Sequence, residues 1–516
     1  MSQPHSTPRP EIVIGLVGAV GTDLYLVAEL TSAIVRSFGY RVEDVVSLSG
    51  LLNDIVRSEP LPKTPREDYI DSRMDAGNSL RRELEYGDAL AQLAVAEIMR
   101  RRRAVQDAAN SAREQPPEAV AYILRSLKHQ DEVALLREIY RERFVCISAH
   151  APRDERIKRL AGDIADSHGS TDRHDWDAEA TRLAQRDEAE ENDRFGQDVR
   201  GTFPKADFFI DASHRTTASE QLERCLRAWF GDPFASPTPE EFGMFHAHAA
   251  AVRSADLSRQ VGAAIAIGGD VVAVGSNEVP AFGGGAYWVG QEGDARDFML
   301  GQDANARIRA AAIEEVRNAL KDAGWLRRDK STHTADEFAA ILHGTRVDQL
   351  TEFGRAVHAE MSAILDAARR GQSVKGATIY TTTFPCHNCA KHVVGAGLTE
   401  VVYIAPYPKS LAEDLHPDTI AIEPSEPPNN LVVFRPFVGV APLSYLPLFE
   451  QVGKRKTPKG EAVEFFRAGA RPKLALGGDL SYLEREDLAV VSLDQTLRTK
   501  KVRLKRRRAL PSPTLN

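Results

Sequence analysis

Apolar runs and amphipathic stretches alternate over the first part of the chain, a pattern typical of a sheet covered by helices. The run at 11–17 leads through Gly18 and Gly21 into a helical pattern that ends at Gly39. Further apolar runs predict strands, and a long helical stretch lies between them; the strands are at 41–48, 144–148 and 206–210, and the helix is at 69–100. The sequence therefore predicts a doubly wound α/β domain.

A proline-rich stretch follows this domain and divides the chain. Pro233, Pro237 and Pro239 come shortly after a helical pattern that contains Trp229. We therefore expect the first domain to cover residues 1–235.

The pattern beyond the prolines predicts a second domain, 240–450, built on a mixed sheet. A helix at 240–254 precedes two strands, 259–267 and 271–275, which a Gly-Gly-Asp turn joins as a hairpin. Helices and strands then alternate, with helices at 353–370 and 390–396 and strands at 377–384 and 401–405. Such an order indicates an α/β/α sandwich. The insertion 283–351 is typical of a lid or an interface piece, and both interpretations stay open.

Residues suited to metal binding gather in two short motifs of the second domain. His358-Ala359-Glu360 lies on one predicted helix, and Pro385-Cys386-His387-Asn388-Cys389 opens the next. Zinc favours four tetrahedral N and S ligands, and a catalytic site keeps one position for water. His358, Cys386 and Cys389 supply three ligands between two helix N-termini, while the Glu360 carboxylate is placed to carry protons. The spacing predicts a hydrolytic zinc site, and the pattern His-x-Glu followed by Pro-Cys-x-x-Cys resembles that of the zinc nucleobase deaminases.

Two other interpretations of the cysteine pair are less well supported. A CxxC pair also occurs in redox sites and in structural zinc sites. A structural site needs a fourth protein ligand, and the other two cysteines, Cys146 and Cys225, lie far upstream. His387 and His392 are the remaining candidates for a fourth ligand.

The glycine-rich turn after the first strand has the layout of a phosphate-binding P-loop. It includes Gly15, Gly18, Gly21 and Thr22. The lysine of the full motif is missing, because Thr22 and Asp23 stand where lysine and Ser/Thr are expected. The turn therefore predicts a bound nucleoside triphosphate without phosphoryl transfer, and a turn that binds nothing is the alternative.

Composition limits the class of protein. The 516 residues include only four cysteines, which fits a reducing compartment, so we expect a cytoplasmic protein. A net charge of −8 argues against general coating of nucleic acid. No apolar run approaches the ~18 residues that a membrane-spanning helix needs, so no membrane partner is expected.

The last segment, 451–516, is predicted to be an extension with a basic tail. A solvated tail is the favoured interpretation and RNA binding is the alternative. The basic residues are Lys500, Lys501, Arg503, Lys505, Arg506, Arg507 and Arg508.

With these motifs in place, residues 246–449 resemble the deoxycytidylate deaminase branch of the cytidine deaminase superfamily. The matching residues are 258–263, Asn277 and the two zinc motifs. Residues 11–450 together resemble the anti-phage dCTP/dCMP deaminases of bacteria, which carry a P-loop kinase-like domain in front. The resemblance implies an N-terminal P-loop NTPase-like sheet, a C-terminal cytidine-deaminase-like sandwich, Zn2+, a homo-oligomer and, in some members, control by a small RNA.

The resemblance also implies roles for single residues. His358, Cys386 and Cys389 hold zinc, and Glu360 shuttles protons between water and the cytosine ring. Asn277 contacts the deoxyribose or the base, and Lys409 is a candidate phosphate ligand.

In this family, free deoxycytidine nucleotides, dCTP or dCMP, are converted to the uracil nucleotides plus ammonia. This depletes them during phage infection, and we expect the first domain to regulate the reaction.

Two other functions are weighed against this one. A polynucleotide-editing cytidine deaminase would use the same metal site with a basic groove and aromatic platforms. Aromatic residues make up only 7% of the chain, which argues against it. A nucleotide kinase or sensor with an accessory deaminase-like domain is disfavoured by the complete zinc motif and the missing P-loop lysine.

Overall fold

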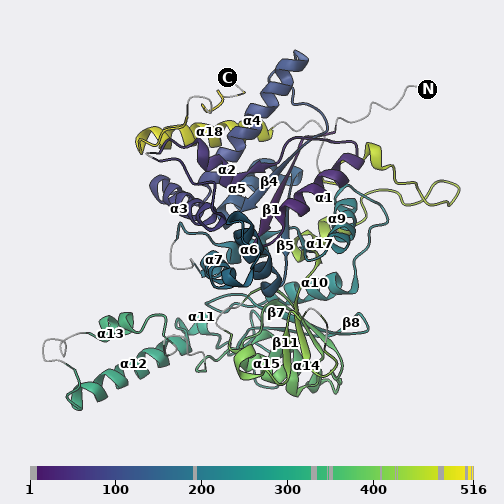
Figure 1. Ribbon diagram of the computed structural model, residues 1–516. Coiled ribbons are helices and arrows are strands. Elements are labelled where there is room, and N and C mark those ends of the chain that lie inside the picture. Colours follow the sequence, from purple (N-terminus) through teal and green to yellow (C-terminus); the bar gives the residue numbers. More distant parts are fainter. Residues whose placement is uncertain are drawn as a thin grey trace. The chain divides into compact units, whose positions relative to one another are not determined.

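A computed structural model describes residues 9–57, 59–189, 194–326, 334–345, 347, 352–406, 410–424, 426, 428–474, 481–505, 509–512 and 514. The chain forms two compact units (Figure 1). The first unit combines Met1–Glu241 with Pro436–Asn516, and the second is Phe242–Arg435. These bounds differ from the expected ones, because the chain returns to the first unit at Pro436 and no separate extension begins at residue 451.

The first unit contains a sheet with the strand order β13-β6-β5-β1-β4-β2, and β3 also pairs with β4. The strands are β1 (Ile12–Gly18), β2 (Arg41–Val42), β3 (Val46–Ser47), β4 (Val120–Leu127), β5 (Phe144–His150), β6 (Phe208–Asp211) and β13 (Gly439–Val440). All the pairings are parallel except that of β13 with β6. The prediction of an α/β fold is confirmed, although β4 was not predicted and 41–48 contains two short strands.

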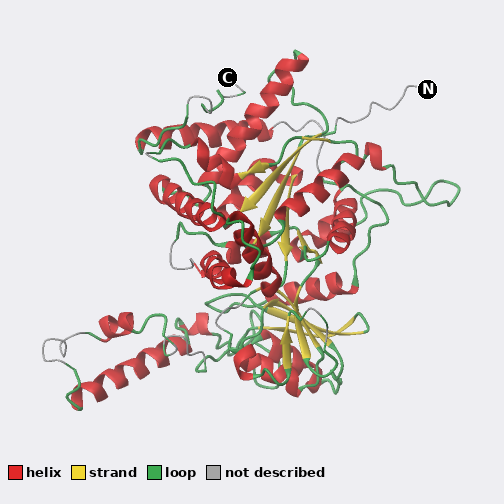
Figure 2. Cartoon of the chain, viewed as in Figure 1, coloured by secondary structure: helices red, strands yellow, loops and turns green. Residues whose placement is uncertain are grey.

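Helices cover this sheet, as Figure 2 shows. One face of β1 packs through Ile12, Ile14 and Leu16 against α1 (Leu24–Ser37) and α9 (Arg215–Trp229). The helix expected at 69–100 is two helices, α3 (Arg66–Leu84) and α4 (Ala89–Ala109), because Glu85 adopts a left-handed conformation with φ 61° and ends α3. The remaining helices of eight or more residues before the second unit are α5 (Gln130–Tyr140), α6 (Arg153–Ser167) and α7 (Asp177–Ala189).

The returning segment completes the first unit. It adds β13, α17 (Pro442–Phe449) and α18 (Ser481–Thr499). Glu486 of α18 forms a bidentate ion pair with Arg102 of α4 at 2.6 and 2.8 Å, and both side chains are buried. The Arg102 guanidinium also contacts Glu11 at 2.7 Å. A buried, hydrogen-bonded ion pair therefore attaches the end of the described chain to its beginning.

The second unit contains a six-stranded sheet in the order β11-β12-β10-β9-β7-β8. Its strands are β7 (Gly262–Ile267), β8 (Asp270–Ser276), β9 (Thr378–Thr383), β10 (Glu400–Ala405), β11 (Ile420–Ile422) and β12 (Val432–Pro436). The hairpin β7–β8 is antiparallel and β9 pairs parallel with β10, so the predicted mixed sheet is confirmed.

Three helices accompany this sheet outside the insertion. They are α10 (Pro239–Ala251), α14 (Ala359–Arg369) and α15 (His387–Gly395). A Cβ at Gly275 of β8 would lie 2.2 Å from the Ala359 carbonyl oxygen, so only glycine allows α14 to approach the strand this closely. The insertion contributes α11 (Asp297–Leu300), α12 (Ala304–Asp322) and α13 (Ala335–Ile341).

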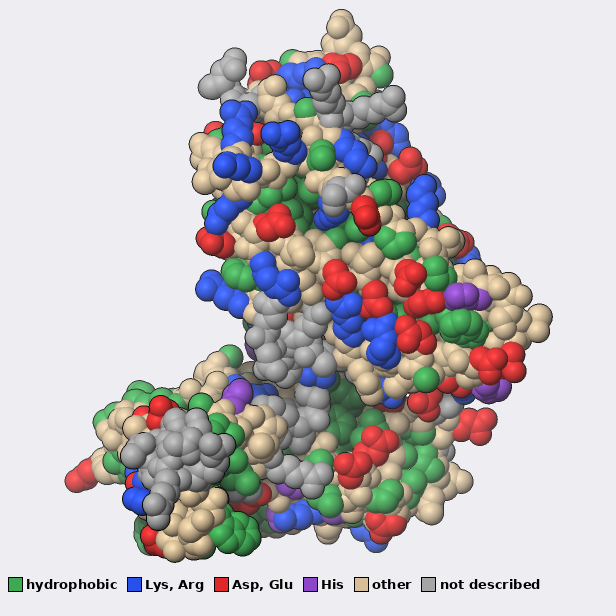
Figure 3. Space-filling view, turned by 60° about the vertical axis from the view of Figure 1, so that its left-hand side comes forward, with side chains coloured by type: hydrophobic (Ala, Val, Ile, Leu, Met, Phe, Trp, Pro, Cys, Tyr) green, Lys and Arg blue, Asp and Glu red, His purple; other side chains and the backbone are tan. Residues whose placement is uncertain are grey.

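Acidic and basic side chains are intermixed over much of the face shown in Figure 3. Among the described residues, no helix is long and apolar enough to cross a membrane.

Candidate active site

Two helix starts bring the zinc-type ligands together. His358 is the N-cap of α14 and Cys386 is the N-cap of α15, with extended backbone at both positions. Cys389 follows in the first turn of α15 and is buried. The His358 Nδ1 atom lies 3.3 Å from the Cys386 Sγ atom and 3.4 Å from the Cys389 Sγ atom.

This trio is the only group of three or more His, Cys, Asp or Glu side chains in the described part of the chain with donor atoms close enough for one metal ion. The donor atoms all lie within 4.8 Å of one another. One imidazole and two thiols match the ligand types that zinc prefers. Neither His387 nor His392 joins the group, so the interpretation as a four-ligand structural site gains no support.

The local electrostatics suit a metal ligand. A hydrogen bond with Cys389, helped by another with His358, lowers the pKa of the Cys386 thiol. The thiolate is the form that binds metal. Both helix N-termini also present positive dipole ends, which favour a negatively charged ligand set.

Glu360 lies beside the trio in the first turn of α14. Its side chain is only 4% exposed, and burial raises the pKa of its carboxyl group. A carboxyl group with a pKa closer to neutrality can both accept and donate a proton. The structure therefore places a buried carboxyl group next to the predicted ligands.

Asn277, at the end of the β7–β8 hairpin, is buried and bound to the backbone. Its Oδ1 atom accepts the Val261 N–H at 2.7 Å, and its Nδ2 atom donates to the Arg259 carbonyl at 2.8 Å. One amide hydrogen is left for another acceptor. The predicted substrate contact of Asn277 stays a prediction, and Lys409 lies outside the described residues.

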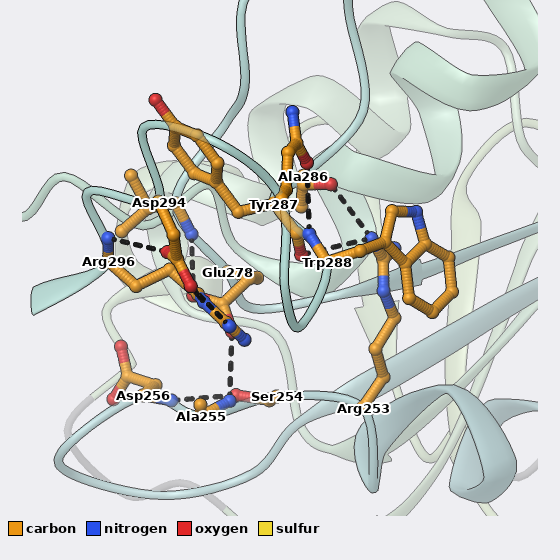
Figure 4. Close-up of polar contacts among 12 residues, drawn as sticks. Arg253, Ser254, Ala255, Asp256, Glu278, Ala286, Tyr287, Trp288, Asp294 and Arg296 are labelled. Carbon is orange, nitrogen blue, oxygen red and sulfur yellow. Dashed lines mark hydrogen bonds and ion pairs between the residues drawn. The ribbon is translucent and has the colours of Figure 1, made fainter. Parts of the chain in front are cut away.

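Glu278 is a residue that the sequence analysis did not assign to the site (Figure 4). Its carboxylate accepts the N–H groups of Ala255 and Val279, both at 2.9 Å, and lies 3.9 Å from the Arg296 guanidinium. Its backbone exchanges two hydrogen bonds with Val357, directly before His358. Arg296 in turn pairs with Asp294. A single buried acid thus connects the segment before the histidine to the loop after α10 and to the insertion.

The glycines of the predicted phosphate loop divide into two groups. Gly15 lies inside β1, where a Cβ would be 2.6 Å from the Leu127 side chain, so it serves packing and does not line a cavity. Gly18, Gly21 and Thr22 do line a cavity of the first unit.

Comparison with known proteins identifies the second unit. Residues 237–405 match the cytidine and deoxycytidylate deaminase zinc-binding region. Deoxycytidylate deaminase of Enterobacteria phage T4 is 30% identical over 153 residues, which cover 30% of this chain and 70% of that protein. The chain belongs to the cytidine and deoxycytidylate deaminase family.

The chain is also similar to a second phage protein and to a solved structure. Deoxycytidylate deaminase of phage T2 is 29% identical over 30% of this chain and 72% of that protein. A crystal structure of dCMP deaminase from cyanophage S-TIM5 aligns at 18% identity with a TM-score of 0.22, covering 39% of this chain and 98% of that one. Because the chain belongs to this family, it is a hydrolytic deaminase and zinc is its cofactor.

Proposed function

We propose that this deaminase hydrolyses the 4-amino group of free deoxycytidine nucleotides, dCMP and dCTP, to give the uracil nucleotides and ammonia. The observation that carries the proposal is the buried Glu360 beside the His358, Cys386 and Cys389 donors. The related phage proteins are named deoxycytidylate deaminases, which supports a nucleotide substrate.

The chemistry divides between the metal and Glu360. His358, Cys386 and Cys389 would hold zinc, which makes water a nucleophile at neutral pH. Glu360 takes a proton from the attacking water as it adds to C4 of cytosine. It gives that proton to N3, and it then carries the second proton to the amino group, which leaves as ammonia. One carboxyl group serves every step because its protonation state alternates through the cycle.

Substitutions at the site separate the two roles. Glu360→Gln should lower kcat at least about 10³-fold while zinc content stays at one ion per chain, because the residue carries protons and does not bind the metal. Cys386→Ala should lose both zinc and activity. Metal analysis and ammonia release from dCMP, dCTP, CMP and a cytosine-containing oligonucleotide provide the measurements. Turnover of dCMP by Glu360→Gln at a rate close to that of the wild type would contradict the mechanism.

The substrate panel also tests the alternative functions. Activity on the oligonucleotide alone would favour an editing enzyme. Phosphoryl transfer by the wild type would favour a kinase. The remaining N–H of Asn277 is the proposed contact to the nucleotide, so Asn277→Ala should lower kcat/KM without loss of zinc.

We further infer a role in defence: the enzyme would deplete cytoplasmic deoxycytidine nucleotides during phage infection and be held inactive through its first unit. Support comes from the resemblance of the two-domain order to anti-phage deaminases. A homo-oligomer and a regulatory small RNA belong to the same proposal. Plaque counts on cells that express the wild type or Glu360→Gln test the defence role, since only the active enzyme should protect.

A further inference from the structure

The first unit contains a second candidate site, a cavity of about 310 Å3 at the carboxyl ends of β1 and β4. Open α/β sheets bind ligands outside the carboxyl ends of their strands. The loop after β1, helices α3 and α6, and the residues that end β4 all contribute to the wall. Lining residues include Gly18, Tyr25, Tyr69, Arg73, Arg125 and Arg159.

Positive charge predominates along this wall, and part of it lacks a counter-charge. Arg73 is only 7% exposed, its guanidinium lies 3.5 Å from the centre of the Tyr69 ring, and its Nε atom has no hydrogen-bond partner. The Arg125 guanidinium lies 3.5 Å from the centre of the Tyr25 ring. Neither arginine forms an ion pair with a carboxylate in the described part of the chain. Among the described residues, the buried Arg73 donates hydrogen bonds only to uncharged acceptors, the carbonyl oxygens of Pro62 and Tyr69 and the Ser72 hydroxyl, and Arg125 is half-buried. Because a guanidinium group that is shielded from water and has no counter-charge is costly, both arginines favour an anionic ligand.

Part of the cavity wall is apolar. Leu52, Ile70, Met74 and Leu90 line it together with the two tyrosine rings. A cavity with cationic and apolar parts suits a phosphate group joined to a flat, weakly polar ring system, which is the chemistry of a nucleotide.

An internal carboxylate already occupies the anion position of the glycine loop. The Asp187 side chain of α7 is fully buried, and its Oδ2 atom accepts the Val20 N–H at 2.7 Å. The same carboxylate binds the Lys128 ammonium group at 2.9 and 3.0 Å. Lys128 also donates to the Gly18 carbonyl at 3.0 Å. The Val20 N–H and the Lys128 ammonium group, which could bind a terminal phosphate, are therefore already bound to the Asp187 carboxylate.

We propose that this cavity binds a nucleoside monophosphate on Arg73 and Arg125, and that Asp187 excludes triphosphates by occupying the phosphate position of the loop. A γ-phosphate directed at the loop would meet the Asp187 carboxylate, and two anions in contact repel strongly at low dielectric. The site therefore responds to the monophosphate pool. Its connection to control of the deaminase rests on the function proposed above.

Hydrogen exchange measured by mass spectrometry on the full, zinc-loaded chain distinguishes this cavity from the active site. Peptides that cover 18–25 and 121–128 report on the cavity, and peptides that cover 386–392 report on the active site. The probes are dCMP, dUMP and dAMP, the matching triphosphates, and inorganic phosphate. Monophosphates should slow exchange in the cavity peptides of the wild type, and triphosphates should not.

Three variants test the residues. Arg125→Gln should weaken monophosphate protection at least tenfold, whereas the control Arg215→Gln, an exposed arginine paired with Glu29 on another face, should leave it unchanged. Asp187→Asn keeps the size of the side chain, removes the charge and should admit triphosphates.

Four outcomes would overturn the proposal. They are triphosphate protection of the wild-type cavity equal to that by monophosphates, no protection by any nucleotide, equal protection by phosphate alone, and an Asp187→Asn protein that still rejects triphosphates. If the Asp187→Asn protein does not fold, the comparison of monophosphates with triphosphates on the wild type and the Arg125→Gln variant still test the proposal. Ammonia release measured in parallel keeps failure of the proposed deamination separate from failure of this site.

Discussion

Glu278 contacts three segments of the second unit, two through its side-chain carboxylate and one through its backbone N–H and carbonyl groups. It accepts the Ala255 N–H, lies near Arg296 and pairs with the backbone of Val357 beside His358. The backbone of Glu278 thus holds the residue before His358, although Glu278 does not itself belong to the metal group. Residues of this kind orient ligands without contacting the metal.

Replacement of Glu278 by alanine should weaken the site without removing a ligand. The buried Val279 N–H would lose its acceptor, which costs about 1–3 kcal/mol, and the half-buried Ala255 N–H would lose its acceptor at a smaller cost. We expect lower thermal stability and about tenfold lower zinc affinity, measured by calorimetry and by competition with a chelator. Glu292→Ala, an exposed acid of the insertion, is the control. Unchanged zinc affinity in Glu278→Ala would exclude this positioning role.

At the residue scale, the metal ligands could be predicted from the sequence because their residue types and spacing are unusual. Charged residues of common types that make important contacts could not be predicted. His358, Cys386 and Cys389 form a spacing that few other functions need. Glu278, Lys128 and Asp187 are common charged residues. Only the fold shows that Glu278 and Asp187 are buried, that Lys128 is half-buried, and which groups all three contact. The sequence indicates only that each of these residues lies near the end of a strand or in a helix, which is true of many charged residues.

Element packing sets the position of the metal group as much as the motifs do. The prediction placed the start of the metal-binding helix at residue 353, but α14 begins at Ala359 because the preceding Val357 pairs with Glu278 as extended backbone. Periodicity cannot detect this, since an apolar residue suits either conformation. Strand β4 was missed for a related reason: it follows two prolines and a charge-rich helix, and its central position in the sheet arises from tertiary pairing.

Gly275→Ala tests the close packing of α14 on β8. The new methyl group would lie 2.2 Å from the Ala359 carbonyl oxygen and 2.3 Å from the Ala363 nitrogen, so the helix has to move. Overpacking of this kind costs about 1–3 kcal/mol, and displacement of His358 and Glu360 should lower kcat as well. Gly395→Ala is the matched control, because its methyl group would meet no atom within 4 Å. Equal activity of the two variants would show that α14 tolerates the shift.

Helix α7 is attached to α3 by ion pairs that depend on pH. Burial alone would raise the pKa of Asp71, but hydrogen bonds from Arg182 and Arg186 outweigh it and hold the pKa below its usual value. The stabilisation is therefore present above the unfolded pKa of about 4 and is lost as the pH falls through the lower, folded value. Asp71→Asn should cost about 0.5 kcal/mol at pH 7, because the pair is partly exposed, and much less near pH 2.

Hydrogen exchange of α7 at the two pH values measures this effect. Asp68→Asn, at an exposed position on α3, the helix that also carries Asp71, provides the control. The prediction fails if Asp71→Asn changes α7 protection equally at both pH values.

At the scale of the whole molecule, the first unit is built from both ends of the chain. Arg102 pairs with Glu486 and Glu11, and the hydroxyl groups of Tyr140 and Tyr482 complete the network at 2.7 Å from these carboxylates. Composition could not reveal this, because residues separated by hundreds of positions meet only in the fold.

Glu486→Ala should destabilise the first unit by about 3–5 kcal/mol, because it removes the bidentate partner of a fully buried guanidinium. Exchange in α4 and α18 should rise while α14 keeps its protection. Glu484→Ala, on the exposed side of α18, should have little effect. A Glu486→Ala protein as stable as the wild type would show that the network contributes nothing.

The division of the chain at Glu241 and Pro436 also determines the order in which the protein is completed on the ribosome. The whole second unit is synthesised before β13 exists to pair with β6. The Glu241 carboxylate then accepts the Val440 N–H at 2.7 Å. The last residue of the first segment of this unit therefore binds the segment that is added after the second unit. A nascent chain stopped before residue 436 would therefore contain every residue of the deaminase unit, its zinc ligands included, while it lacked β13, α17 and α18 of the first unit.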